Sequence, residues 1–309
     1  MKIKGEHTLI VTFIHPGVVW NISNLKSTIQ NQTYRKFDVL LVLDEIHPTE
    51  LDFPAEWQVL SNHYKFDIPT LRYIAIQYAA KHNYEYIIFI DGDDSMSLSR
   101  VEVILDNFKG FDFIVNEIVP VDKSGDEIGA PVLRDLFLSP VIADFKTIFD
   151  RNLIGLSNSA IRVPPVKGVK IPNIIIAVDW YLFTVLLLEN YRGYFVEKTN
   201  TYYTQYDANT VGLSGSFTSD TIRYYLDVKI RHFYALELFG RNTQNKWYKD
   251  IRMYLDDLLV LSKLLENDSK LSLYKKLITS ENLEFKGWWD RLKVSKEIIN
   301  ELVSENKRK

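Results

Sequence analysis

Three carboxylates stand within four residues of this sequence, directly after a short apolar run. The run is YIIFI at residues 86–90, and Asp91, Gly92, Asp93 and Asp94 follow it. Carboxylates this close repel one another, so we expect a cation among them, and Mg²⁺ commonly binds through one or two carboxylates plus substrate phosphates. The pattern predicts a metal–phosphate site. The alternative is an acidic turn or helix start, which aspartate also favours.

A fourth carboxylate, Asp179, interrupts the apolar stretch from Ile174 to Leu188. Burial among apolar side chains would raise the pKa of this group toward the range useful for a general base. The alternative is that Asp179 caps a helix expected from Trp180 to Asn190. One residue could do both.

The elements that must position these residues follow from the pattern of apolar residues. The first part of the chain alternates between strand-like runs and segments of helical spacing. We expect strands at 8–14, 37–43, 57–60 and 86–90, and helices at about 19–32 and 69–81. Such alternation is typical of an α/β domain with a largely parallel sheet covered on both faces. Ligands of these sheets bind beyond the carboxyl ends of the strands, where the acidic cluster stands.

The last third of the chain has a different character. All ten prolines lie at or before Pro172, and only two glycines occur after Ser216. The scarcity of helix breakers and the helical spacing of apolar residues predict three or four helices between 218 and 304. We therefore divide the chain into an α/β domain at 1–216 and a helical subdomain at 217–309.

Composition excludes several classes of function. The 309 residues carry a net charge of −3 and no cysteine, so we expect no nucleic-acid partner, no disulfide framework and no thiolate zinc site. Neither a Walker nor a Gly-x-Gly-x-x-Gly motif occurs. The start lacks the apolar segment of a signal peptide, and the longest apolar stretch is shorter than the ~20 residues that cross a bilayer. We expect a cytoplasmic protein.

Several segments resemble family 2 glycosyltransferases, which have the GT-A fold. Residues 86–94 are similar to the metal-binding Asp-x-Asp segment of that family. Further similar segments occur in the family's order, at 32–34 with 37–45, at 72–76, at 178–180 and at 205–212. The resemblance covers roughly residues 7–216. It implies the GT-A fold, with the helical subdomain as an addition.

The resemblance also implies an activity. Family members transfer a sugar, with inversion, from a nucleoside-diphosphate sugar to an acceptor hydroxyl. A UDP-sugar is the expected donor, and polysaccharide or glycoconjugate assembly, with a glycan or lipid-linked acceptor, is the expected setting. The cofactor would be Mg²⁺ or Mn²⁺.

The roles that the resemblance implies are assigned residue by residue. Asp179 would be the catalytic base. The metal ligands would be Asp93, Asp91 and Asp207. The nucleotide would contact Thr12, Asp44, Arg72 and Asp91, and Arg72 could instead hold the acidic cluster. Trp180 and Asn158 would contact the acceptor or the transferred sugar, although Trp180 could equally fill the core.

Departures from the family pattern keep other functions open, and besides Tyr73 and the ending Leu43-Asp44-Glu45 they include two residues of the closing segment. Tyr206 stands where a metal-binding histidine is usual, and Thr204 replaces an arginine. One alternative is a catalytically degenerate GT-A protein that binds a nucleotide or glycan without turnover. Another is a sugar nucleotidyltransferase, but the segment after the first strand lacks the glycine-rich loop and cation of that class.

The function of the C-terminal helices is a separate question. The pair Trp288-Trp289 lies near basic residues and could sit at the inner face of a membrane, making the protein peripheral. The helices could also contact the acceptor, form a homo-oligomer, or simply pack on the core.

Overall fold

A computed structural model describes residues 7–206, 218–279, 287–289 and 292–304 of the chain. Within these residues, nine strands form one sheet in the order β3-β2-β1-β4-β8-β6-β9-β5, with β7 also paired to β9. The strands are β1 Thr8–Ile14, β2 Asp38–Leu43, β3 Gln58–Ser61, β4 Tyr86–Asp91, β5 Ser95–Met96, β6 Phe113–Val121, β7 Val141–Ile142, β8 Ser159–Arg162 and β9 Gly193–Thr204.

Most of the sheet is parallel, as the sequence predicts. Strands β3, β2, β1 and β4 pair in parallel. Strand β8 lies antiparallel between β4 and β6, so β6 again points the same way as the first four strands. Strand β9 runs parallel to β6, while the short strands β5 and β7 oppose β9. The first four strands fall where apolar runs predict them.

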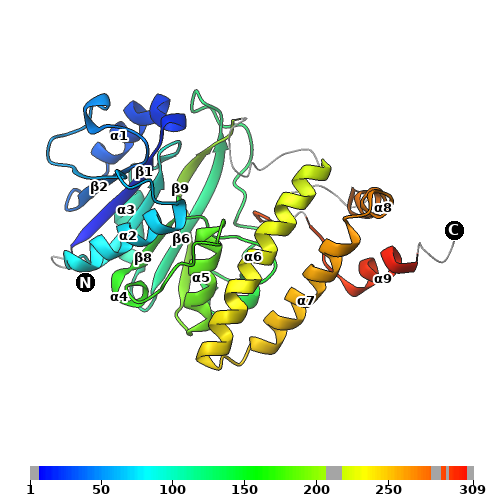
Figure 1. Ribbon diagram of the computed structural model, residues 1–309. Helices are drawn as coiled ribbons and strands as arrows, with labels where there is room; N and C mark the ends of the chain where they lie inside the picture. The colour runs from blue at the N-terminus through cyan, green and yellow to red at the C-terminus, as the bar shows by residue number, and fades with distance from the viewer. Residues whose placement is uncertain (1–6, 207–217, 280–286, 290–291, 305–309) are drawn as a thin grey trace.

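Helices cover both faces of the sheet (Figure 1). Alternate residues of β1 point to opposite faces: Leu9 and Val11 join one apolar cluster, and Ile10 joins the other. The second cluster is closed by helices α1 and α3, and the first by α2, α5 and the C-terminal helices. The helices before residue 178 are η1 Pro16–Asn21, α1 Ile22–Gln30, η2 Pro48–Glu50, α2 Ile68–Lys81, α3 Arg100–Asn107, η3 Phe145–Ile148 and α4 Val163–Val166.

Helix α5, Val178–Leu188, is apolar around its whole circumference, and nearly all its residues are buried. A helix of this kind must lie inside the protein. Its N-cap is Ala177, two residues before the cap that the sequence suggests, and Asp179 lies in the first turn. Asp179 is therefore not the cap of α5.

The described residues of the C-terminal part form four helices: α6 Ser219–Thr243, α7 Tyr248–Leu264, α8 Asp268–Thr279 and α9 Lys296–Ser304. Helices α6 and α7 pack together, and α6 also contacts α5 (Figure 1). Buried residues of α6, α7 and α9 belong to the same apolar cluster as one face of the sheet. The expected boundary at 216/217 lies outside the described residues. No helix in the described part of the chain is both long enough and apolar enough to span a bilayer.

Candidate active site

The acidic cluster leaves the sheet at the carboxyl end of β4, where Asp91 is the last strand residue. Position 92, the next residue, has room only for glycine. A Cβ atom there would lie 2.7 Å from the carbonyl oxygen of Phe13 and 2.7 Å from Cγ2 of Val18. The Asn21 amide donates hydrogen bonds to the carbonyl oxygens of Gly92 and Asp94, each over 3.1 Å. The end of β1 and helix η1 therefore hold the acidic loop in place.

The three carboxylates of the cluster do not point to one place. Asp94 is fully buried and accepts hydrogen bonds from Oγ of Ser157 and from the backbone N–H of Thr204 over 3.0 Å. Burial raises the pKa of Asp94 well above its usual value. Asp91 and Asp93 instead line a cavity of about 320 Å³. Asp94 thus fixes the loop to β9. Asp91 and Asp93 are the two carboxylates of the cluster that could contact a ligand in the cavity.

Arg72, on helix α2, lines the same cavity. Its Nη2 lies 3.2 Å from Oδ1 of Asp91, and its guanidinium carbon stands 3.3 Å from the centre of the Phe13 ring. Burial lowers the pKa of Arg72, although Asp91, Asp179 and Asp93 oppose this effect. Its Nη1 is buried and has no hydrogen-bond partner among the described residues. A buried donor without a partner is unusual, and a charged guanidinium is a strong donor to anionic groups.

Asp179 reaches this cavity from the first turn of α5. Its Oδ1 accepts a hydrogen bond from the backbone N–H of Trp180 over 2.8 Å. Burial raises the pKa of Asp179 to about 6, against the opposing effects of that hydrogen bond and of the Arg72 charge. A carboxylate of this basicity is largely ionised at neutral pH and can still accept a proton.

Asn158 also lines the cavity. Its amide nitrogen donates to the carbonyl oxygen of Asn116 over 2.9 Å. Its Oδ1 is buried without a hydrogen-bond partner in the described part of the chain. The side-chain amide of Asn158 is therefore fixed by the core through its nitrogen.

Asp44 lies beside this cavity instead of in it. It lines a second cavity of about 450 Å³, which shares Ile68 and Ile176 with the first. The Asn62 amide donates to Oδ1 of Asp44 over 2.6 Å and also bonds the backbone of Phe66. The carboxylate is thereby oriented at the carboxyl end of β2.

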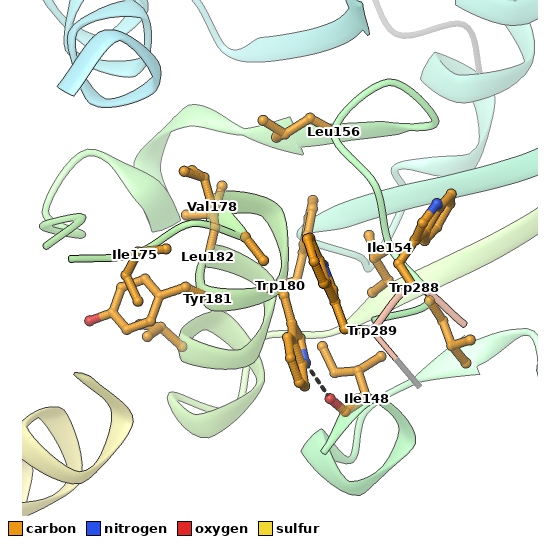
Figure 2. Packing of buried hydrophobic residues seen from close by; sticks show 14 of the residues in the cluster. Ile148, Ile154, Leu156, Ile175, Val178, Trp180, Tyr181, Leu182, Trp288 and Trp289 are labelled. Carbon is orange, nitrogen blue, oxygen red and sulfur yellow. Dashed lines mark hydrogen bonds between the residues drawn. The ribbon is translucent and has the colours of Figure 1, made fainter. Parts of the chain in front are cut away.

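Two residues assigned from the resemblance are placed elsewhere. Thr12 is fully buried in the middle of β1 and lines neither cavity. Trp180 is also fully buried, and its Nε1 donates to the carbonyl oxygen of Ile148 over 2.6 Å (Figure 2). Its ring stacks on His232 with centroids 3.9 Å apart. The expectation that Trp180 contacts a sugar is corrected, because both its polar edge and its ring face are used by the core. Asp207 lies outside the described residues.

The donor set suits a cation that also binds phosphate. No three His, Cys, Asp or Glu side chains converge as a metal cage in the residues described above. Asp91 and Asp93 match the one or two carboxylates that hold Mg²⁺ beside phosphates. Tyr206 donates a hydrogen bond to Oδ2 of Asp93 over 2.9 Å, and burial with the nearby carboxylates raises the pKa of Tyr206. The phenol is therefore a neutral donor to one carboxylate oxygen.

Two supporting residues were not found from the sequence. Ser157 Oγ accepts from the backbone N–H of Asp91 over 3.1 Å and donates to Asp94. Arg100 is fully buried beneath the loop and donates to the carbonyl oxygens of Phe89 and Ser157 over 2.9 and 2.8 Å. Burial lowers the pKa of Arg100 to about 9. Their partners are distant in sequence, so no local pattern could reveal them.

Comparison with known proteins supports the fold. No protein-family model and no curated protein sequence matches the chain. The chain is similar in structure to S. aureus TarS, with a TM-score of 0.55 and 14% identity over 84% of this chain, although it spans only 43% of that protein. TarS 1–349 gives a TM-score of 0.53 at 12% identity, covering 99% of this chain and 92% of that one. Its complex with UDP-GlcNAc gives 0.52 at 12%, covering 89% and 83%. The GT-A fold is confirmed, together with the C-terminal helical part.

Proposed function

We propose that this protein transfers a sugar from a nucleoside-diphosphate sugar to an acceptor hydroxyl, with inversion at the anomeric carbon. The observation that carries the proposal is a convergence of side chains. Arg72 from α2, Asp91 and Asp93 from the end of β4, and Asp179 from α5 all line one cavity. Burial shifts the pKa values of Arg72, Asp93 and Asp179, and a cavity with such groups at the carboxyl ends of parallel strands is where catalysis is expected.

The donor would span the two adjoining cavities. Asp44 would contact the nucleoside in the second cavity. Arg72 would bind the diphosphate in the first cavity, because its Nη1 has no hydrogen-bond partner among the described residues. Asp91 and Asp93 would hold Mg²⁺ or Mn²⁺, which neutralises charge on a departing diphosphate. A UDP-sugar is the preferred donor because the structurally similar TarS 1–349 binds UDP-GlcNAc.

Asp179 would act as the general base. Its half-buried carboxylate accepts a hydrogen bond from its own helix and faces the cavity that holds the cationic Arg72. In its ionised form it would take the proton of the acceptor hydroxyl as that oxygen attacks the anomeric carbon. The hydroxyl attacks from the face opposite the diphosphate, and the configuration is therefore inverted.

A second candidate function rests on Tyr206. Its hydrogen bond engages Asp93, the carboxylate best placed for a metal. If this contact keeps a cation out, the protein would bind a nucleotide or glycan without turnover. Sugar transfer would require Asp179 as the base, whereas binding without turnover would not.

The test measures UDP release from UDP-GlcNAc with Mn²⁺, in the wild type and in Asp179→Asn. Loss of release by at least a hundredfold, with UDP affinity retained within about twofold, supports transfer chemistry. A matched control is Asp144→Asn, because Asp144 also accepts a backbone hydrogen bond but lies outside the cavity. A wild type that binds UDP but never releases it from the sugar would support the binding protein instead.

A further inference from the structure

The cavity that contains Asp179 also has an aromatic wall. We use this name for Tyr203, Tyr224, Trp288 and Trp289, all of which line the cavity. Tyr203 comes from β9 and Tyr224 from α6, while the two tryptophans precede α9. The C-terminal part of the chain thus supplies most of this wall, whereas Trp180 supplies none of it.

The tryptophans are held by specific backbone contacts. The N–H of Trp288 donates to the carbonyl oxygen of Asn152 over 2.8 Å, and the N–H of Asn152 donates back over 2.9 Å. Gly287 has φ +135°, and a Cβ atom there would lie 2.9 Å from the carbonyl oxygen of Asn152. Trp289 has φ +65°, which a bulky residue rarely adopts. Backbone strain of this kind is retained where surrounding structure enforces it, often at functional sites.

The rings of the wall are also fixed against one another. Trp288 meets Tyr203 edge to face with centroids 5.9 Å apart, and Trp289 meets Tyr224 at the same separation. Both tryptophans are more than nine-tenths buried (Figure 2). Because these rings are already ordered, a ligand would lose little free energy in ordering them.

Charge restricts what the wall could bind. The described residues that line the cavity include the carboxylates of Asp91, Asp93 and Asp179 but one cation, Arg72, which already pairs with Asp91. In the proposed donor complex, Arg72 and the cation would be engaged by the diphosphate, so an anionic acceptor would meet the Asp179 carboxylate without a cation of its own and would be disfavoured. A neutral ring with one apolar face and hydroxyl groups at its edge would suit an aromatic surface beside a carboxylate base.

We infer that the aromatic wall is the acceptor subsite and that it binds a neutral pyranose ring, which presents a hydroxyl to Asp179. This inference rests on the proposed function and adds the class of acceptor. The apolar C–H face of the sugar would lie on the ring of Tyr224, which is 40% exposed, beside the exposed edges of the two indole rings. The C-terminal region would then select the acceptor, while the strand ends bind the donor.

Saturation-transfer NMR tests the inference, in the presence of UDP and Mg²⁺. The probes are the methyl β-pyranosides of glucose, galactose and N-acetylglucosamine, with sorbitol as a flexible polyol that has no ring face. We expect at least one pyranoside to bind through the protons of one ring face. Trp288→Leu and Tyr224→Ala should weaken this binding about tenfold and leave UDP affinity within twofold.

Two further variants separate a subsite from a packing defect. Trp57→Phe alters a tryptophan of similar burial in the other apolar cluster, which lines neither cavity, and should change nothing. Tyr224 is 40% exposed, so Tyr224→Ala should fold even if Trp288→Leu does not.

The outcomes that overturn the inference are distinct. Binding of UDP without any pyranoside, or sorbitol binding as well as the pyranosides, would remove the acceptor subsite but leave the proposed function standing. A parallel loss of UDP affinity in Tyr224→Ala would assign the wall to the donor. Failure of the wild type to bind UDP would overturn the proposed function and this inference together.

Discussion

The hydroxyl of Tyr206 donates a hydrogen bond to Oδ2 of Asp93 over 2.9 Å, at the position where the resemblance to family 2 glycosyltransferases implies a histidine. Burial and the neighbouring Asp91 raise the pKa of Asp93, and the Tyr206 hydrogen bond opposes this rise. The phenol therefore keeps Asp93 ionised more readily, but it supplies no good ligand of its own. Cation affinity at this site depends on that balance.

Replacing Tyr206 by histidine should strengthen metal binding. A neutral imidazole is a better ligand for Mn²⁺ than a neutral phenol. We expect Tyr206→His to lower the Kd for Mn²⁺ about tenfold in the presence of UDP, measured by calorimetry. Tyr206→Phe is the control, because it removes the hydrogen bond without adding a ligand. Equal Mn²⁺ affinity in both variants would show that residue 206 does not adjoin the cation.

Arg72 should matter for the phosphates and not for the nucleoside. Its pairing with Asp91 places a fixed cation in the cavity, and its Nη1 has no hydrogen-bond partner within the described ranges. Arg72→Met should reduce the affinity for UDP at least tenfold and that for uridine less than twofold. Arg72→Lys should retain only part of the wild-type affinity for UDP, because lysine lacks the planar guanidinium that can donate two parallel hydrogen bonds. Competition binding measures both ligands, and an equal loss for uridine would contradict the assignment.

Arg100 should stabilise the fold from below the acidic loop. It is fully buried and bonds backbone carbonyls of β4 and of the Ser157 loop. Arg100→Met would leave these groups and the Asp94 carboxylate without their buried cation, so we expect a loss of about 3–5 kcal/mol in the free energy of unfolding. Urea denaturation measures it. Arg231→Met, in an exposed pair on α6, should cost less than about 1 kcal/mol.

The activity should depend on the ionisation of Asp179. Burial raises its pKa to about 6, and only the deprotonated form can act as a base. The rate of transfer should therefore rise about tenfold per pH unit below 6 and level off above about 7. Initial rates of UDP release between pH 4.5 and 8 give the profile. A rate independent of pH across this range, with chemistry limiting, would exclude Asp179 as the base.

Much of the proposed donor site follows from local sequence. An apolar run that ends in Asp91 and Asp93 is sufficient to place both carboxylates at a strand end, and β4 confirms the strand. Asp179 could be selected as a candidate functional residue because burying a carboxylate in an apolar stretch costs free energy, which a function can justify. Both patterns lie within a few residues of the carboxylates they identify, and the tertiary structure keeps the local elements that they predict.

The aromatic wall, which we propose as the acceptor subsite, could not be predicted from local sequence. Trp180 adjoins Asp179 in sequence, but successive residues on a helix do not face the same way, and Trp180 points into the core while Asp179 lines the cavity. Trp288 and Trp289 reach the cavity only because their segment bonds Asn152, far earlier in the chain. Ser157 and Arg100 likewise act through partners distant in sequence.

Calorimetric binding of UDP tests the central claim most directly, with Mn²⁺ and without it, in the wild type and in Asp93→Ala. Asp106→Ala, on the exposed face of α3, is the control. The account predicts that UDP binds the wild type and the control, that Mn²⁺ tightens this binding, and that Asp93→Ala removes the effect of the metal. Absence of UDP binding by the folded wild type would contradict the proposal that these cavities hold a nucleotide-sugar donor.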